Sequence, residues 1–146
     1  MKDVAGFDFL ASIMERKAPI APMLATIPAL IVELEAGRIV LEAQPGAEHY
    51  NTLGSVHGGY AATLLDTCMG CSVHSKLGVG FGFTTLEIKV NFTRPLTKDM
   101  GPVRAEGRVL SIGRRVATAE GRLTDITGTR LLAHATSTCL ILDLNE

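Results

Sequence analysis

The feature that most constrains this chain is a proline-free stretch with a helical pattern, from about Ser55 to Leu77, which contains a single acidic residue, Asp66. Small and apolar side chains make up most of the stretch, and Gly78 and Gly80 follow it as end signals. A helix that is apolar on most of its sides is stable only when other elements cover those sides. The rest of the chain is therefore expected to wrap around this helix.

The segments on either side of the helix have the alternation that is typical of strands. Residues 29–45, ALIVELEAGRIVLEAQP, form two alternating runs around Ala36-Gly37, which predicts a hairpin. After the helix, the run FTTLEIKVNFT (83–93) predicts a third strand, and three more strands are predicted within 101–113, 114–126 and 129–142. A short amphipathic helix is predicted over 7–17.

A hairpin, one long helix and then four strands form an α+β layout. The simplest way to bury the helix is a curved antiparallel sheet around it, the arrangement known as a hotdog. Residues 1–146 are interpreted as one such domain, with an N-terminal helical segment at 1–28 and the hotdog core at 29–142. Small domains of this kind leave sheet edges open and commonly pair to cover them, so a dimer is expected.

Charge and composition exclude several classes of function. The formal net charge is -1, aromatic residues make up 5% of the chain and Trp is absent, so neither a basic nucleic-acid surface nor a base-stacking platform is predicted. Asp3 and Asp8 interrupt the N-terminus where a signal peptide would be apolar, and Pro22 and Pro28 break the apolar run at 19–32. We expect a cytoplasmic protein that binds neither nucleic acid nor membrane.

Three cysteines are an odd number, which does not suit a secreted disulfide framework. Cys68 and Cys71 form a C-x-x-C, but they lie deep in the predicted helix and not at its N-terminus, where the dipole would activate a thiol. No further ligands at workable spacing suggest a zinc site, and none is assigned. We interpret these two residues and Cys139 as buried small hydrophobes.

The start of the long helix is a candidate oxyanion site. The first amides of a helix have no internal partner and carry the positive end of the dipole. Gly58 and Gly59 have no side chains, so a ligand carbonyl could approach their amides closely. The alternative is that the His-Gly-Gly sequence is simply a tight turn into the helix.

Asp66 interrupts a helix face made of small side chains, with no Lys or Arg within one turn. It is either a general base or nucleophile that faces a cleft, or a carboxylate hydrogen-bonded to a neighbouring hydroxyl or loop. Gly58 and Asp66 are eight residues apart, which is about 12 Å along a helix. One carbonyl cannot contact both, so a shared reaction requires the two residues to come from different copies of the chain.

The motif N-x-L-G-x-x-H-G-G at 51–59, followed seven residues later by Asp66, resembles the PaaI-type hotdog acyl-CoA thioesterases. The resemblance extends from about Leu30 to Leu142 and includes EIKVNFTRPL (87–96) and SIGRR (111–115). It implies hydrolysis of acyl-CoA thioesters, with aryl-acetyl, aromatic or medium-chain acyl groups, to the free acid and CoA. It also implies a homodimer, commonly a dimer of dimers, and no cofactor apart from the CoA of the substrate.

Carried over by position, the resemblance implies five catalytic residues. Asp66 would activate water or attack the thioester itself, and the Gly58 amide of the partner subunit would polarise the carbonyl. Asn51 would help to position the water or the carboxylate, and His57 would shape the loop. Thr85 would hold the catalytic water, although alternation places Thr85 on the polar face of its strand and Thr84 on the apolar face.

Substrate-binding residues are predicted from their chemistry. Gly59 lies beside the oxyanion amide, and the guanidinium groups of Arg94, Arg114 and Arg115 suit the phosphates of CoA, unless they are only solvated strand ends. Two phenylalanines placed before the third strand line either the acyl pocket or the ordinary core; these are Phe81 and Phe83.

Two other classes of hotdog protein remain as alternatives. A non-catalytic acyl-CoA-binding protein would have the same fold, although a sensor usually carries an added DNA-binding segment. Dehydratases and hydratases use a histidine with an acid, and His74 is eight residues beyond Asp66, which is the wrong offset. We therefore favour the thioesterase.

Overall fold

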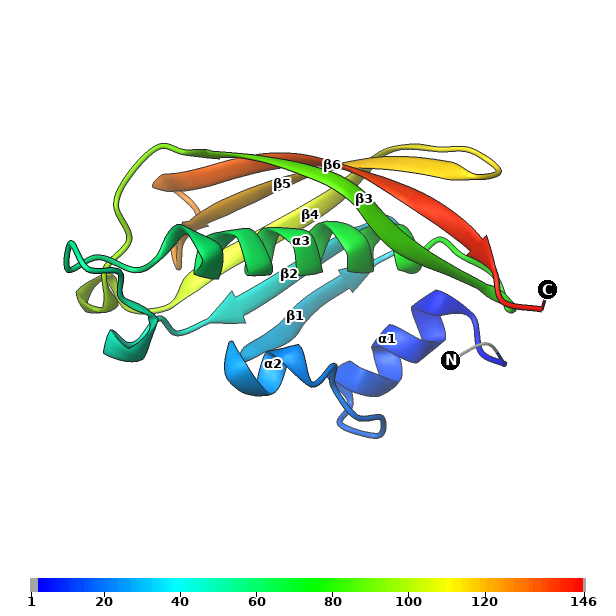
Figure 1. Ribbon diagram of the computed structural model, residues 1–146. Coiled ribbons are helices and arrows are strands. Elements are labelled where there is room, and N and C mark those ends of the chain that lie inside the picture. The colour runs from blue at the N-terminus through cyan, green and yellow to red at the C-terminus, as the bar shows by residue number, and fades with distance from the viewer. Residues whose placement is uncertain (1–2, 146) are drawn as a thin grey trace.

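The computed structural model describes residues 3–145, and its architecture is a curved sheet around one long helix (Figure 1). The helices are α1 (Gly6–Met14), α2 (Met23–Thr26) and α3 (Gly58–His74), with 3-10 turns at Ala47–His49 and Lys98–Met100. The strands are β1 (Ala29–Glu35), β2 (Arg38–Ala43), β3 (Phe81–Phe92), β4 (Val103–Ile112), β5 (Val116–Asp125) and β6 (Leu131–Asp143). All adjacent strands are antiparallel, in the order β1-β2-β4-β5-β6-β3. The predicted α+β hotdog is confirmed.

The long helix is shorter at both ends than the sequence pattern predicts. It begins at Gly58, because His57 has an extended backbone and its Nδ1 accepts a hydrogen bond from the Gly59 amide at 2.9 Å. It ends at His74, and the amide of Leu77 then closes a turn on the His74 carbonyl at 2.9 Å. Side-chain capping and turn bonds therefore define the ends more narrowly than the apolar pattern does.

The core lies between α3 and the concave face of the sheet. The side chains that α3 buries there are almost inaccessible; they include Leu64, Leu65, Cys68, Met69 and Val73. The helix approaches β4 so closely that a Cβ atom at Gly107 would lie 2.3 Å from the Cys68 carbonyl oxygen. A glycine at this position lets the helix lie directly on the strand backbone.

A β-bulge in β3 overturns one expectation from the sequence. Its pairing with β6 shifts between Thr85 and Glu87, so Leu86 has no cross-strand partner. Before the bulge the odd-numbered residues face α3, and after it the even-numbered residues do, because one extra residue inverts the alternation. Thr85 therefore faces the helix and Thr84 faces outward, the reverse of the sequence prediction.

The N-terminal helical segment packs against the C-terminal end of α3. The Gly6 amide donates to the Leu77 carbonyl at 3.0 Å, and α1 lies below β1 and α3 in Figure 1. The short helix α2 was not predicted, since Pro22 and Pro28 flank its single turn. Strand β3 begins at Phe81, two residues before the predicted strand, so Phe81 and Phe83 both lie within it.

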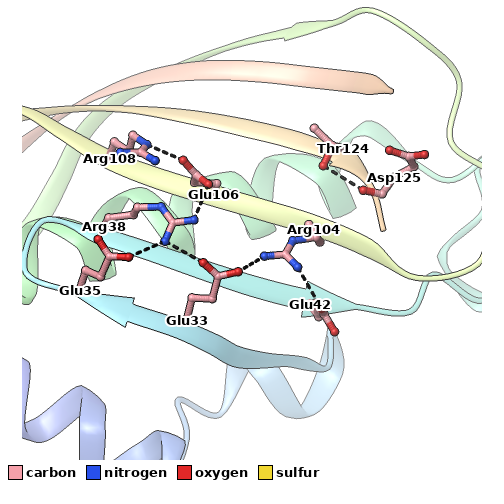
Figure 2. Close-up of polar contacts among 9 residues, drawn as sticks. All are labelled: Glu33, Glu35, Arg38, Glu42, Arg104, Glu106, Arg108, Thr124 and Asp125. Carbon is pink, nitrogen blue, oxygen red and sulfur yellow. Dashed lines mark hydrogen bonds and ion pairs between the residues drawn. The ribbon is translucent and has the colours of Figure 1, made fainter. Parts of the chain in front are cut away.

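The outer face of β1, β2 and β4 carries a network of ion pairs (Figure 2). Arg38 bonds Glu33 at 2.7 Å and Glu106 at 2.9 Å, and Arg104 pairs with Glu33 and Glu42. Hydrogen bonds from Arg38 and Arg104 lower the pKa of Glu33. Burial alone would raise the pKa of Glu106, but hydrogen bonds from Arg38 and Arg108 lower it overall. These glutamates therefore stabilise the fold above their unfolded-state pKa, and this stabilisation is lost as the pH falls through their folded pKa.

The three cysteines are free; the predicted burial is confirmed for Cys68 and Cys139, whereas Cys71 is only half-buried. Cys68 and Cys139 are buried, and burial raises the pKa of both thiols.

Within residues 3–145, no group of three His, Cys, Asp or Glu side chains is placed to hold a metal ion. None of the helices described is long and apolar enough to cross a membrane.

Candidate functional site

One side of α3 is left uncovered by the sheet. The two edge strands are β1 and β3, and the helix side between them carries Gly59, Ala62, Thr63, Asp66 and Thr67, none of which is fully buried. The C-terminal half of the same side is covered by α1 and by Phe83 of β3. The exposed part of the helix is therefore a strip of small residues with one carboxylate in it.

Asp66 has a defined partner across this strip. The Thr85 hydroxyl, on β3, donates a hydrogen bond to Asp66 Oδ1 at 2.8 Å. The bulge at Leu86 makes this contact possible, because it turns Thr85 toward the helix. Both sequence alternatives for Asp66 are thus compatible with the structure: the carboxylate has a hydroxyl partner, and it also lies on an accessible side of the helix.

The His-Gly-Gly turn leaves one amide without a partner. The Gly59 amide donates to His57 Nδ1, and the Tyr60 amide donates to the His57 carbonyl at 3.0 Å. Among residues 3–145, no group accepts a hydrogen bond from the Gly58 amide. Of the two glycines predicted to face a ligand, Gly58 therefore has the available donor, and Gly59 uses its donor to cap the helix.

Asn51 holds the loop before the helix. Its Oδ1 accepts from the Leu53 amide at 2.9 Å and from the Ser55 amide at 3.3 Å, and its Nδ2 donates to Ser55 Oγ at 3.1 Å. The structure thus shows a loop-ordering role for this side chain, whereas contact with a catalytic water stays a prediction. His57 likewise orders the turn, since its backbone amide donates to the His49 carbonyl at 2.7 Å.

Arg94 lies near the helix start, and the other two predicted arginines do not. A cleft of about 370 Å³ is lined by His57, Gly58, Phe92 and Arg94, among others. Arg94 Nη1 also donates to the Leu131 carbonyl at 2.8 Å, at the beginning of β6. By contrast, Arg115 lies beside Ile141, near the far end of β6, and Arg114 precedes it in the β4–β5 turn. Within one chain these arginines do not form a single phosphate site.

The two phenylalanines have different environments. Phe83 packs over Gly70, where a Cβ atom would lie 2.6 Å from its ring, and its centroid is 5.7 Å from that of His74. Phe83 therefore matches the core alternative. Phe81 is 39% exposed at the start of β3. Neither lines the apolar cavity of about 650 Å³ below α3, which the sequence did not predict.

If the chain has the thioesterase activity that the resemblance implies, replacing Thr85 with valine is expected to lower kcat by about ten- to a hundredfold while KM stays near its wild-type value, because the carboxylate loses the group that orients it. The measurement is thiol release from an acyl-CoA. Thr84→Val is the matched control, since Thr84 is exposed on the opposite face of the same strand. A Thr85→Val protein with wild-type kcat would contradict the positioning role, and Thr85→Ser should keep most of the activity.

The antiparallel sheet around one central helix identifies the chain as a hotdog-fold protein. Its helix exposes one hydrogen-bonded carboxylate. The model of the thioesterase superfamily matches residues 53–132, which is more than half of the chain. The protein belongs to the thioesterase superfamily, and the predicted resemblance to its PaaI-type members is confirmed.

Two relatives are provisionally named esterases. The protein of Halobacterium salinarum is 39% identical over 69 residues, which are 46% of this chain and 44% of that protein. The protein of Saccharolobus solfataricus is 32% identical over 98 residues, which are 67% of this chain and 68% of that protein. The first match thus spans less than half of the relative's length.

Solved structures share the fold over most of the chain. A provisionally named thioesterase of Ralstonia eutropha JMP134, related to phenylacetic acid degradation, has a TM-score of 0.82 and 26% identity, over 90% of this chain and 98% of its own. A Streptococcus mutans UA159 protein bound to acetyl-CoA has a TM-score of 0.71 and 25% identity, over 79% of this chain and 89% of its own. The E. coli PaaI protein, at 16% identity and a TM-score of 0.80, over 94% of each chain, shows the same fold.

Proposed function

We propose that the protein hydrolyses acyl-CoA thioesters to the free acid and CoA, with Asp66 as the reacting carboxylate. The observation that carries this proposal is the Asp66–Thr85 pair on the uncovered side of α3, at 2.8 Å. Membership of the thioesterase superfamily supports the reaction class, and the acetyl-CoA complex of the Streptococcus mutans protein supports CoA thioesters as ligands.

The chemistry follows from how the carboxylate is held. Thr85 occupies Asp66 Oδ1, which leaves the second carboxylate oxygen for the reaction. That oxygen either takes a proton from a water that attacks the thioester carbon or attacks that carbon itself to form an anhydride, which water then hydrolyses. In both routes a C–O bond forms, the C–S bond breaks, and CoA leaves as the thiol. The reaction requires no metal and no organic cofactor.

The Gly58 amide is proposed to stabilise the oxyanion from the partner subunit. It is a helix-start donor without a partner among residues 3–145 of its own chain, and about 12 Å of helix separates it from Asp66. The free edge of β3 supports pairing of two chains, since Leu86 and Phe92 there are 57% and 58% exposed. We propose a homodimer with two composite sites, which pairs further into a dimer of dimers in the cytoplasm.

Mixing two inactive variants tests this composite site. Asp66→Asn removes the carboxylate. Gly58→Pro removes the amide hydrogen at the first helical position, where proline fits, and the extended backbone of His57 is compatible with a following proline. If the groups come from different chains, refolding the two variants together restores one site in each mixed dimer, or roughly a quarter of wild-type activity by random pairing. Thiol release from a panel of acyl-CoAs is the readout.

Gly58→Ala is the matched control, because it adds bulk near Phe92 but keeps the amide hydrogen. We expect it to retain most of the activity. No recovery on mixing, with mixed dimers present, would contradict the composite site. If the wild type releases no thiol from any acyl-CoA but binds one in calorimetry, the protein is a non-catalytic acyl-CoA-binding hotdog protein, and the proposed reaction is wrong.

A further inference from the structure

A cavity of about 650 Å³ lies between the N-terminal helical segment, β1 and the C-terminal half of α3. Its walls include side chains from five elements: Leu10 and Ile13 of α1, Leu24 of α2, Ile31 of β1, Leu41 of β2 and Cys71 of α3. Figure 1 shows α1 and α2 below β1 and α3, and residues of all four elements line the cavity. The volume is in the range of sites that bind small organic molecules.

The walls carry almost no charge. Burial raises the pKa of the Cys71 thiol to about 12 and lowers that of His74, so both side chains are neutral near pH 7. The Thr67 hydroxyl is satisfied within the helix, since it donates to the Thr63 carbonyl at 2.7 Å. Among the described residues that line the cavity, Arg16 is the one that carries a charge at neutral pH. Such a cavity suits hydrocarbon.

The cavity adjoins the proposed reaction site along α3. Thr67, which follows Asp66 directly, is part of its lining, and both residues lie on the uncovered strip of α3. Cys71 and His74 continue the lining toward the C-terminal end of the helix. A thioester held at Asp66 could therefore extend its tail along α3, beneath α1, while its CoA portion points away from the cavity.

We propose that this cavity binds the acyl tail and selects a flexible aliphatic chain of medium length; this inference rests on the proposed function. The lining is mostly aliphatic, and Phe9 is the one aromatic hydrocarbon ring among the described lining residues. Its rim holds large exposed apolar side chains: Met14 at 44%, Ile20 at 42% and Leu30 at 59%. An aliphatic tail would cover this surface, and each buried methylene contributes about fourfold in affinity.

The test uses alkyl-CoA thioethers, which cannot be hydrolysed, so that binding is measured apart from catalysis. Ala21 lines the cavity and is exposed, so Ala21→Phe narrows the cavity at little cost to folding. Ala25, four residues on in α2, is exposed and is not among the lining residues, which makes Ala25→Phe the matched control.

We expect wild-type protein to bind decyl-CoA at least a hundredfold more tightly than methyl-CoA in calorimetry. Ala21→Phe should weaken decyl-CoA binding by about tenfold and leave methyl-CoA binding unchanged, whereas Ala25→Phe should change neither. In thiol release, the same variant should shift the preferred acyl chain to shorter lengths.

Two outcomes would overturn the inference. Equal decyl-CoA affinity in Ala21→Phe and wild type would place the tail elsewhere, even in an active thioesterase. Tighter binding of a phenylethyl thioether than of the decyl thioether would show that the cavity selects rings. If the wild type binds decyl-CoA as expected but hydrolyses no acyl-CoA, the proposed reaction fails and the tail site stands.

Discussion

Asp66→Asn is expected to lower kcat for acyl-CoA hydrolysis by about a thousandfold, with the fold and the oligomeric state unchanged. The amide is nearly the same size, and its oxygen still accepts the hydrogen bond that Thr85 donates to Oδ1. It has no basic oxygen to take a proton from water and no anionic oxygen to attack the thioester. The substitution is therefore expected to change the stability of the fold little and to lower the rate of hydrolysis strongly.

The measurement is thiol release from a panel of acyl-CoAs, alongside circular dichroism and size-exclusion chromatography of the same preparations. Asp99→Asn makes the same change of charge at an exposed position in the turn after β3, and we expect it to be as active as the wild type. A correctly folded Asp66→Asn protein that kept a tenth or more of the activity would show that another group performs the reaction.

Gly107→Ala is expected to destabilise the protein by about 3 kcal/mol or more, because the added methyl group meets backbone and not a movable side chain. At Gly107 the new Cβ would lie 2.3 Å from the Cys68 carbonyl oxygen and 2.7 Å from the Met69 nitrogen. Relief would require α3 to move away from β4, which would loosen the packing of Leu64, Cys68 and Met69. Urea denaturation measures the change.

Gly121→Ala is the matched control, since Gly121 is the direct cross-strand partner of Gly107. A Cβ there would meet the ends of two flexible side chains, Leu65 at 3.0 Å and Met69 at 3.1 Å, so the expected cost is about 1 kcal/mol. Equal losses of stability in the two variants would show that the close approach of α3 to β4 is not the reason for glycine at position 107.

The sequence predicted the site best where local backbone chemistry decides the geometry. The His-Gly-Gly stretch predicted a helix start, and none of the residues that the structure describes accepts a hydrogen bond from the Gly58 amide there. The eight-residue spacing to Asp66 follows from helix geometry, which depends little on the rest of the fold. The homodimer and the residue roles at this site stay predictions.

Prediction was wrong where a single inserted residue changes a strand's orientation. Strict alternation placed Thr85 on the outer face, but the bulge at Leu86 turns it toward Asp66. The apolar pattern of the sequence hardly reveals a bulge, because the position of the bulge depends on how β3 pairs with β6 over the whole length of the strand. The spatial separation of Arg94 from Arg115, at opposite ends of β6, likewise depends on sheet register.

The sequence by itself determined the six strands, the curved sheet around one apolar helix, and the carboxylate on that helix. These follow from periodicity and capping, which act within a few residues of the chain. Only the tertiary structure decided that Thr85 reaches Asp66, and that the N-terminal segment encloses a cavity beside Thr67. Both depend on contacts between segments far apart in the chain, whose distances are set by packing and strand register and not by local preference.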